Sequence, residues 1–299
     1  SNGRVRVHGT TPDRAGAVSA AAISVIAAFE WHTRRTATPS TRSIANESRR
    51  REMLQACLNG DRDSDAHAEL PTDPASMASA AADAVAAGAD NVHLHQKNRD
   101  GTDSLAAEDV ERCVSAVMSA VDVPVGVTTG AWIEPDPRRR VELIRSWPST
   151  PSFASVNWHE EGAVDVADAL MHLDIGVEAG LFNPNAARAW ARYAEATNCL
   201  RALIELPDDL DDTEVRDCAD EMISIVESAH PTVPILLHGS GPSCWPALRY
   251  AAERGLHTRI GLEDTLHLST GDVAQDNTQL MSHACRHIAA RASETAASL

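Results

Sequence analysis

Short apolar runs alternate with alanine-rich stretches from about residue 51 to the end of the chain. Successive runs begin about 30 residues apart, which is the length that one strand, one helix and two short loops need. The pattern therefore predicts repeated strand–helix units around a parallel sheet. The predicted strands are MLQACL (53–58), NVHLH (91–95), VPVGVTT (123–129), FASVNW (153–158), IGVEAG (175–180), LRALIEL (200–206), VPILLHG (233–239) and TRIGLED (258–264).

The segments between these runs carry helix signals. Pro74 opens a stretch that reaches Ala87, and Gly88 follows it, as is typical of helix starts and ends. Further helices are predicted over 108–120, 214–229, 246–254 and 279–292. Eight such units in about 250 residues favour a (β/α)8 TIM barrel over an open sheet, because no GxGxxG follows the first run. In such a barrel, chemistry belongs at the carboxyl ends of the strands.

The first part of the chain does not share this pattern. Arginines precede an apolar run over 15–29, which superficially resembles a signal peptide. The six cysteines are dispersed without a CxxC pair, which indicates neither a zinc ribbon nor a secreted disulfide framework. We therefore expect a cytoplasmic protein with a flexible or loosely docked extension over 1–48 and one catalytic domain over 49–299.

The net charge of the chain bears on whether it binds nucleic acid. Asp and Glu number 43 against 26 for Lys and Arg, so the net charge is −17. This surplus disfavours an extended nucleic-acid surface, which needs a basic face. No apolar run reaches the ~20 residues of a membrane span, so a membrane partner is not expected.

Two strand ends hold a possible metal site. His93 and His95 are two residues apart on a strand, so both side chains face the same way. Glu263, near the end of the last run, would complete a two-histidine, one-carboxylate set that leaves a coordination position open. Asp264 would then be a base beside the metal, oriented by Arg259. Hydrogen-bonded core histidines and an ordinary Arg–Asp ion pair remain alternatives.

Other polar residues also end strands at this side of the predicted barrel. Hydroxyl, amide and carboxylate groups there suit contacts to a substrate, although each alone is equally typical of a strand end. A Gly-rich turn before a helix presents N–H groups to phosphate, with a tight turn as the competing interpretation. These residues are Thr128, Thr129, Gly130, Ser155, Asn157, Glu178, the turn Gly239-Ser240-Gly241, and His159 as a possible lining residue.

Taken together, the motifs AAGADNVHLH…DG, VTTG, FASVN, GVEAGLF, HGSG and TRIGLED, in this order from about Leu54, resemble the β-keto acid cleavage enzymes, whose first characterised type is 3-keto-5-aminohexanoate cleavage enzyme. The resemblance implies a (β/α)8 barrel and a divalent metal, normally zinc. It also implies condensation of a β-keto acid with acetyl-CoA, giving acetoacetate and a new acyl-CoA, by a homodimer or homotetramer.

Residue by residue, the resemblance assigns roles to the candidates above. The metal ligands would be His93, His95 and Glu263, and the general base would be Asp264 with Arg259 as its partner. The threonines, Ser155 and Asn157 would contact the substrate carboxylate and carbonyl. Glu178 would recognise a substrate amino group, and the turn at 239–241 would bind the phosphates of coenzyme A.

The chain departs from the family pattern at two places. The motif at the end of the second run reads HLHQK, so Lys97 stands where members commonly have arginine. The fifth run reads Glu178-Ala179-Gly180 and lacks the usual second acid. A metal-dependent aldolase or hydrolase without CoA, and a non-catalytic barrel that binds small molecules, remain rival hypotheses.

Overall fold

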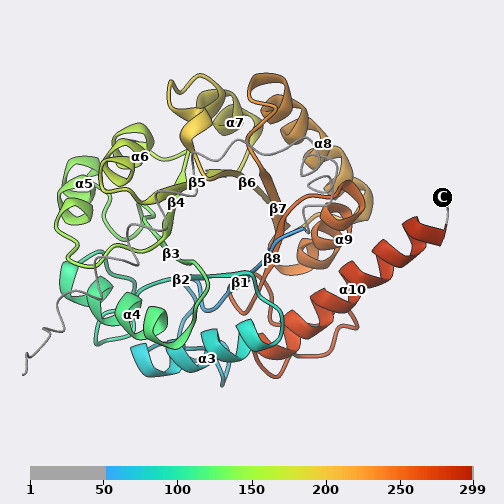
Figure 1. Cartoon of the computed structure of the whole chain (residues 1–299), viewed down its shortest axis with the longest axis horizontal. Helices are drawn as coiled ribbons and strands as arrows, with labels where there is room; N and C mark the ends of the chain where they lie inside the picture. The colour runs from blue at the N-terminus through green and yellow to red at the C-terminus, as the bar shows by residue number, and fades with distance from the viewer. Residues whose placement is uncertain (1–51, 298–299) are drawn as a thin grey trace, which may run out of the picture. The chain divides into compact units, whose positions relative to one another are not determined.

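The computed structural model describes residues 52–297, which form eight parallel strands ringed by helices (Figure 1). Each predicted run overlaps one strand, so the predicted TIM barrel is confirmed. The predicted extension over 1–48 lies outside the described residues. The strands are β1 (Leu54–Cys57), β2 (Asn91–Leu94), β3 (Val125–Thr128), β4 (Phe153–Asn157), β5 (Gly176–Leu181), β6 (Arg201–Leu206), β7 (Ile235–Gly239) and β8 (Thr258–Ile260).

The strands pair in the order β7-β6-β5-β4-β3-β2-β1-β8. Consecutive strands are therefore neighbours, as expected when each helix returns the chain beside the strand before it. Between β7 and β8, Leu236 forms a bridge with His257, and the N–H of Leu237 donates to the carbonyl of His257 at 2.9 Å. This contact joins the two ends of the sheet and closes the barrel.

The predicted helices begin within a few residues of the observed ones. Asp73 and Asp211 cap two of them, each accepting from backbone N–H groups in the first turn. Gly88 follows the helix that Asp73 caps, and Gly255 follows the helix that ends at Arg254; both glycines have positive φ, as their sequence positions predict. The helices are α3 (Pro74–Ala86), α4 (Ala107–Ala120), α5 (Pro137–Arg145), α6 (Ala163–His172), α7 (Pro184–Ala191), α8 (Asp212–Ala229), α9 (Cys244–Arg254) and α10 (Asn277–Ala297), with 3₁₀ turns η2 (Ala196–Asn198) and η3 (Gly241–Ser243).

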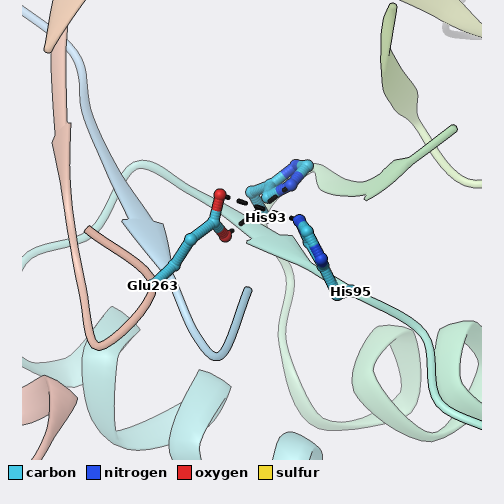
Figure 2. Close-up of side chains that lie close together, drawn as sticks. All are labelled: His93, His95 and Glu263. Atoms are coloured by element: carbon cyan, nitrogen blue, oxygen red, sulfur yellow. Dashed lines mark ion pairs between the residues drawn. The ribbon is translucent and has the colours of Figure 1, made fainter. Parts of the chain in front are cut away.

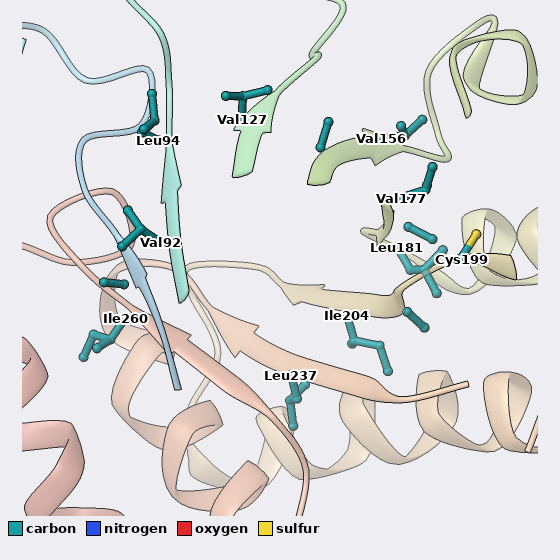
Figure 3. Close-up of a cluster of buried hydrophobic side chains, with 14 of the residues drawn as sticks. Val92, Leu94, Val127, Val156, Val177, Leu181, Cys199, Ile204, Leu237 and Ile260 are labelled. Carbon is teal, nitrogen blue, oxygen red and sulfur yellow. The ribbon is translucent and has the colours of Figure 1, made fainter. Parts of the chain in front are cut away.

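Side chains alternate between the two faces of each strand. On β2, Val92 and Leu94 are fully buried in the main apolar core, which also includes residues of the surrounding helices (Figure 3). The alternate positions, Asn91 and His93, are buried and polar. Apolar side chains on one face therefore hold the barrel together, and the other face is free to carry polar groups.

The eighth strand ends earlier than the sequence predicts. It stops at Ile260, and a Cβ on Gly261 would lie 1.8 Å from the carbonyl oxygen of Cys57 on β1. The N–H groups of Asp264 and Thr265 then both donate to the carbonyl of Gly261 at 3.0 Å. The Glu263-Asp264 pair therefore lies in a tight turn that only glycine permits at its start.

Several of the cysteines are buried. All six cysteines lie among the described residues, and Cys57 and Cys244 are buried thiols. Burial raises the pKa of Cys57 and Cys244, so these two are poor nucleophiles. No helix between residues 52 and 297 combines the length and apolar character needed to cross a membrane.

Candidate active site

A cavity of ≈ 370 Å³ opens at the carboxyl ends of the strands. Six strands line it directly, and β1 and β5 contribute through residues that follow them. TIM barrels carry their chemistry at this end, so the cavity is the candidate active site. Its lining residues are Asp61, His93, His95, Thr128, Trp132, Ser155, Asn157, His159, Glu160, Phe182, Leu203, Glu205, Leu206, His238, Ser240, Arg259, Glu263 and Asp264.

His93, His95 and Glu263 converge in this cavity (Figure 2). One nitrogen from each histidine and one carboxylate oxygen lie within 4.8 Å of one another. Nε2 of His93 is 3.8 Å from Oε2 of Glu263, and Nε2 of His95 is 3.7 Å from Oε1. Glu263 Oε2 is buried without a hydrogen-bond partner among the described residues, and burial lowers the pKa of His93, favouring its neutral form. An orphaned carboxylate oxygen beside a neutral imidazole fits a divalent cation.

The imidazole of His95 is held from its other side by Asp103. Nδ1 of His95 lies 2.9 Å from Oδ2 of Asp103. Asp103 also accepts hydrogen bonds from Lys97 Nζ at 2.6 Å and from Trp132 Nε1 at 2.9 Å. Burial raises the pKa of Asp103, but the hydrogen bonds and charges of His95 and Lys97 outweigh burial and lower it to about 2. Asp103 is therefore a firmly ionised support for His95.

The carboxylate of Asp264 presents two different oxygens. Oδ1 accepts from Arg259 Nη2 at 2.8 Å and Nε at 3.2 Å, and His238 Nδ1 lies 3.4 Å away. Oδ2 is buried without a partner among the described residues. Burial raises the pKa of Asp264, but the charges of Arg259 and His238 lower it by more. Asp264 is thus an ionised carboxylate with one oxygen free to accept a proton.

Only part of the predicted substrate contacts reach the cavity. Thr128, Ser155 and Asn157 line it, and the amide of Asn157 is oriented by donating to Glu160 Oε1 at 2.9 Å. Thr129 does not line it, because its hydroxyl donates to the carbonyl of Ser155 at 2.6 Å. Thr129 therefore supports the neighbouring strand instead of facing a ligand.

Gly130 also lies outside the cavity lining. A Cβ at this position would lie 1.9 Å from the indole ring of Trp132, so the glycine leaves room for that ring. Trp132 stacks on His95, with ring centroids 5.7 Å apart, and lines the cavity. The structural role of Gly130 is therefore to seat the tryptophan against a metal-ligand candidate.

Glu178 is not at the cavity, contrary to its predicted role in recognising a substrate. It has no exposed surface, and its Oε1 accepts from Arg201 Nε at 2.6 Å and from Gln55 Nε2 at 2.9 Å. The guanidinium of Arg201 also lies 5.2 Å from the centre of the Phe153 ring. Because this buried cluster takes up the carboxylate, the geometry does not support the predicted contact with a substrate amino group, which stays a prediction.

The turn at 239–241 presents fewer N–H groups than expected. The N–H of Ser240 donates to Ser243 Oγ at 3.1 Å, and the N–H of Gly241 donates to the carbonyl of Asp264 at 2.7 Å. These two N–H groups are therefore not available to a phosphate. Backbone N–H groups were the reason for expecting a phosphate site at this turn, and the structure does not support that reason. The side chain of Ser240 lines the cavity, and its part in binding coenzyme A stays a prediction.

Several residues of the site were not predicted from the sequence. Glu205 and His238 face each other across β6 and β7, with His238 Nε2 3.2 Å from Glu205 Oε2. Both occupy inward positions near strand ends, so strand alternation was a usable signal for them. Asp103 and Trp132 lie in loops, where no periodicity indicates the direction of a side chain. His159, considered from the sequence, does line the cavity and packs against Phe182.

Similar folds occur among solved structures. ObcA in a binary complex with oxaloacetate superposes with a TM-score of 0.63 at 15% identity, and ObcA with a C4-CoA adduct and oxalate superposes with 0.61 at 16%. Both matches cover 75% of this chain and 64% of ObcA, so the chain spans less than two thirds of that protein. A dihydropteroate synthase from Xanthomonas albilineans has a TM-score of 0.50 at 15% identity, covering 83% of this chain and 94% of that one. At these identities the likeness shows the fold alone.

Sequence comparison is more specific. No curated protein matches the chain. The family model of the beta-keto acid cleavage enzymes matches residues 52–204 and 210–298, which include the His93, His95 and Glu263 cluster and the Arg259–Asp264 pair. On this match over most of its length, the chain belongs to the β-keto acid cleavage enzyme family.

Proposed function

We propose that this protein is a divalent-metal-dependent acyltransferase that condenses a β-keto acid with acetyl-CoA, giving acetoacetate and a new acyl-CoA. One observation carries the proposal. Asp264, whose Oδ2 has no hydrogen-bond partner among the described residues, lies in the same cavity as the converging His93, His95 and Glu263. Family membership supports β-keto acid cleavage. The complex of ObcA with a C4-CoA adduct supports a CoA thioester as the second substrate.

Zn²⁺ is the proposed metal, because two imidazoles and one carboxylate form a common ligand set of catalytic zinc. His93, His95 and Glu263 would hold it. When bound, such a cation supplies Lewis-acid chemistry, which acidifies the carbon between the carboxylate and the keto group of the substrate. Arg259 Nη2 donates to Glu263 Oε1 at 2.9 Å as well as to Asp264, so one guanidinium orients both carboxylates.

Asp264 is the proposed general base. Arg259 and His238 hold its Oδ1, so the unpartnered Oδ2 is the atom that takes the proton from the substrate α-carbon. Thr128 and Ser155, which pair across the adjacent strands β3 and β4 and line the cavity, would donate hydrogen bonds to oxygens of the substrate. The buried position of Asp264 keeps bulk water from competing for the proton.

The proposed reaction needs only the β-keto acid and acetyl-CoA as reactants. The α-carbanion attacks the acetyl carbonyl of acetyl-CoA, a carbon–carbon bond forms, and the CoA thiolate leaves. The thiolate attacks the former keto carbon of the β-keto acid, and the bond between that carbon and the α-carbon breaks. The new acyl-CoA departs, and Asp264 returns its proton to the α-carbon of acetoacetate.

An assay of cationic, neutral and anionic β-keto acids, each with and without acetyl-CoA, tests this proposal. We expect acetoacetate to form only when acetyl-CoA is present. Cleavage that proceeds equally without acetyl-CoA would instead favour a CoA-independent aldolase or hydrolase. The proposed homodimer or homotetramer and the cytoplasmic location are tested separately, by light scattering and by fractionation of cells.

A further inference from the structure

The one lysine of the chain lies beside the proposed metal site. Lys97 follows His95 by two residues and is only 2% exposed, so its ammonium must find partners inside the protein. Its Nζ donates to Asp103 Oδ1 at 2.6 Å and to the carbonyl of Gly60 at 2.7 Å. Asp103 contacts His95, and Gly60 packs against Glu263. Lys97 therefore binds one neighbour of each of these two proposed metal ligands.

A hairpin-like loop brings Asp103 to this place. Lys97 and Asp103 pair as an antiparallel bridge, and the N–H of Asn98 donates to the carbonyl of Thr102 at 2.8 Å. Gly101, near the tip, has a φ of 82°, which suits the Asp-Gly sequence there. The loop therefore returns the chain so that a carboxylate six residues after Lys97 faces it.

From this arrangement we infer that Lys97 and Asp103 are positioning residues that set the metal affinity of the site by fixing His95 and Glu263. The inference rests on the metal centre of the proposed function. It adds residues that do not themselves bind the metal, and it gives a reason for the lysine that follows the two histidines in this chain.

Asp103 fixes which ring nitrogen of His95 carries the proton. Lys97 Nζ and Trp132 Nε1 only donate, so Asp103 must accept from both, and it is also 2.9 Å from His95 Nδ1. A carboxylate at that distance holds the imidazole proton on Nδ1, which leaves the lone pair of Nε2 directed toward Glu263. The Nδ1 of His93, in contrast, has no partner among the described residues, so His95 is the ligand whose tautomer this chain fixes.

Lys97 also binds the backbone against which Glu263 packs. Gly60 has a φ of 63°, and a Cβ there would lie 2.7 Å from Cγ of Glu263. The backbone at Gly60 is thus packed against the third proposed ligand. The Lys97 ammonium binds the carbonyl of Gly60, which packs against Glu263, and also binds Asp103, which contacts His95. One side chain therefore fixes the positions of the groups that support two of the proposed metal ligands.

Metal titration of the apo protein tests the inference without relying on activity. Zn²⁺ affinity is measured by competition with a chromogenic chelator for wild type, Asp103→Asn and Lys97→Met. We expect the dissociation constant to rise about 10–100-fold in both variants, the usual effect of losing a residue that orients a metal ligand. Asp100→Asn, the same substitution on the same loop at an exposed side chain, is the matched control and should bind like wild type.

Two further measurements separate positioning from a merely structural role. Circular dichroism of each apo variant checks that it is folded, and ¹⁵N chemical shifts of His95 report its tautomer, which should lose its preference for Nδ1–H in Asp103→Asn. Should Lys97→Met fail to fold, Trp132→Phe removes another donor to Asp103 from a half-exposed side chain and should still weaken Zn²⁺ binding.

The outcomes distinguish the inference from the proposed function. Folded Asp103→Asn and Trp132→Phe proteins that bind Zn²⁺ as tightly as wild type would overturn the positioning role and leave the metal centre intact. A wild-type protein that binds no divalent cation would overturn the metal centre itself, and the inference with it.

Discussion

Replacing Glu178 by glutamine should weaken the fold instead of altering the choice of substrate. The side chain has no exposed surface, and its Oε1 is 2.6 Å from Arg201 Nε. Removing one partner of a buried ion pair typically costs about 3–5 kcal/mol, because the other charge stays buried without compensation. Glutamine keeps one acceptor oxygen, and Arg201 keeps the Phe153 ring 5.2 Å away, so we expect the lower end, about 3 kcal/mol.

Urea unfolding followed by circular dichroism measures this free energy. At about 2–4 °C per kcal/mol for a chain of this size, the melting temperature should fall by about 6–12 °C. Glu221→Gln, which breaks an ion pair with Arg188 at the surface, is the matched control and should cost less than about 1 kcal/mol. Adding Arg201→Met to Glu178→Gln should recover part of the loss, because no unpaired charge remains.

One result would refute this reasoning. If Glu178→Gln unfolds like wild type but raises KM selectively for β-keto acids with an amino group, the carboxylate contacts substrate. The buried cluster with Arg201 would then not describe the working enzyme.

Three further predictions concern the site. His95→Ala should abolish stoichiometric Zn²⁺ in metal analysis of purified protein, and full occupancy would show that the ligand set is wrong. Asp264→Asn should retain Zn²⁺ but lower kcat about 10²–10⁴-fold, as expected for loss of a general base, so a rate near wild type would remove Asp264 from that role. Since the pKa of Asp103 is lowered from 3.8 to about 2, its stabilisation of about 2 kcal/mol is present above pH 3.8 and lost as pH falls through about 2. Urea unfolding of apo protein from pH 2 to 6 should show this slope, and an equal slope in Asp103→Asn would contradict it.

The repeat of apolar runs about 30 residues apart was sufficient to predict the barrel, because each run overlaps one strand and a helix lies between successive runs. The two-residue period within a strand placed His93 and His95 together. It also placed Glu178 on the inward face, but it could not show that Arg201, on the next strand, takes up that carboxylate. That pairing depends on the register between β5 and β6, which is a property of the folded sheet.

Loops explain most of what the sequence could not predict. Asp103 reaches His95 only because the loop after β2 folds back on itself. The N–H groups of the turn at 239–241 are satisfied by Ser243 and Asp264, partners that local sequence does not reveal. Glycine and serine there correctly indicated a tight turn. A tight turn does not by itself leave N–H groups free for a phosphate, because here other groups of the protein accept from them.

Isotope transfer from acetyl-CoA tests the central claim most directly. The Zn²⁺-loaded enzyme is incubated with a β-keto acid that it turns over and with [1-¹³C]acetyl-CoA, and the products are examined by ¹³C NMR. The proposed bond changes predict that the label appears at the keto carbon, C3, of acetoacetate, and that the new acyl-CoA carries none. Consumption of the β-keto acid with all the label left in acetyl-CoA or acetate would contradict the account.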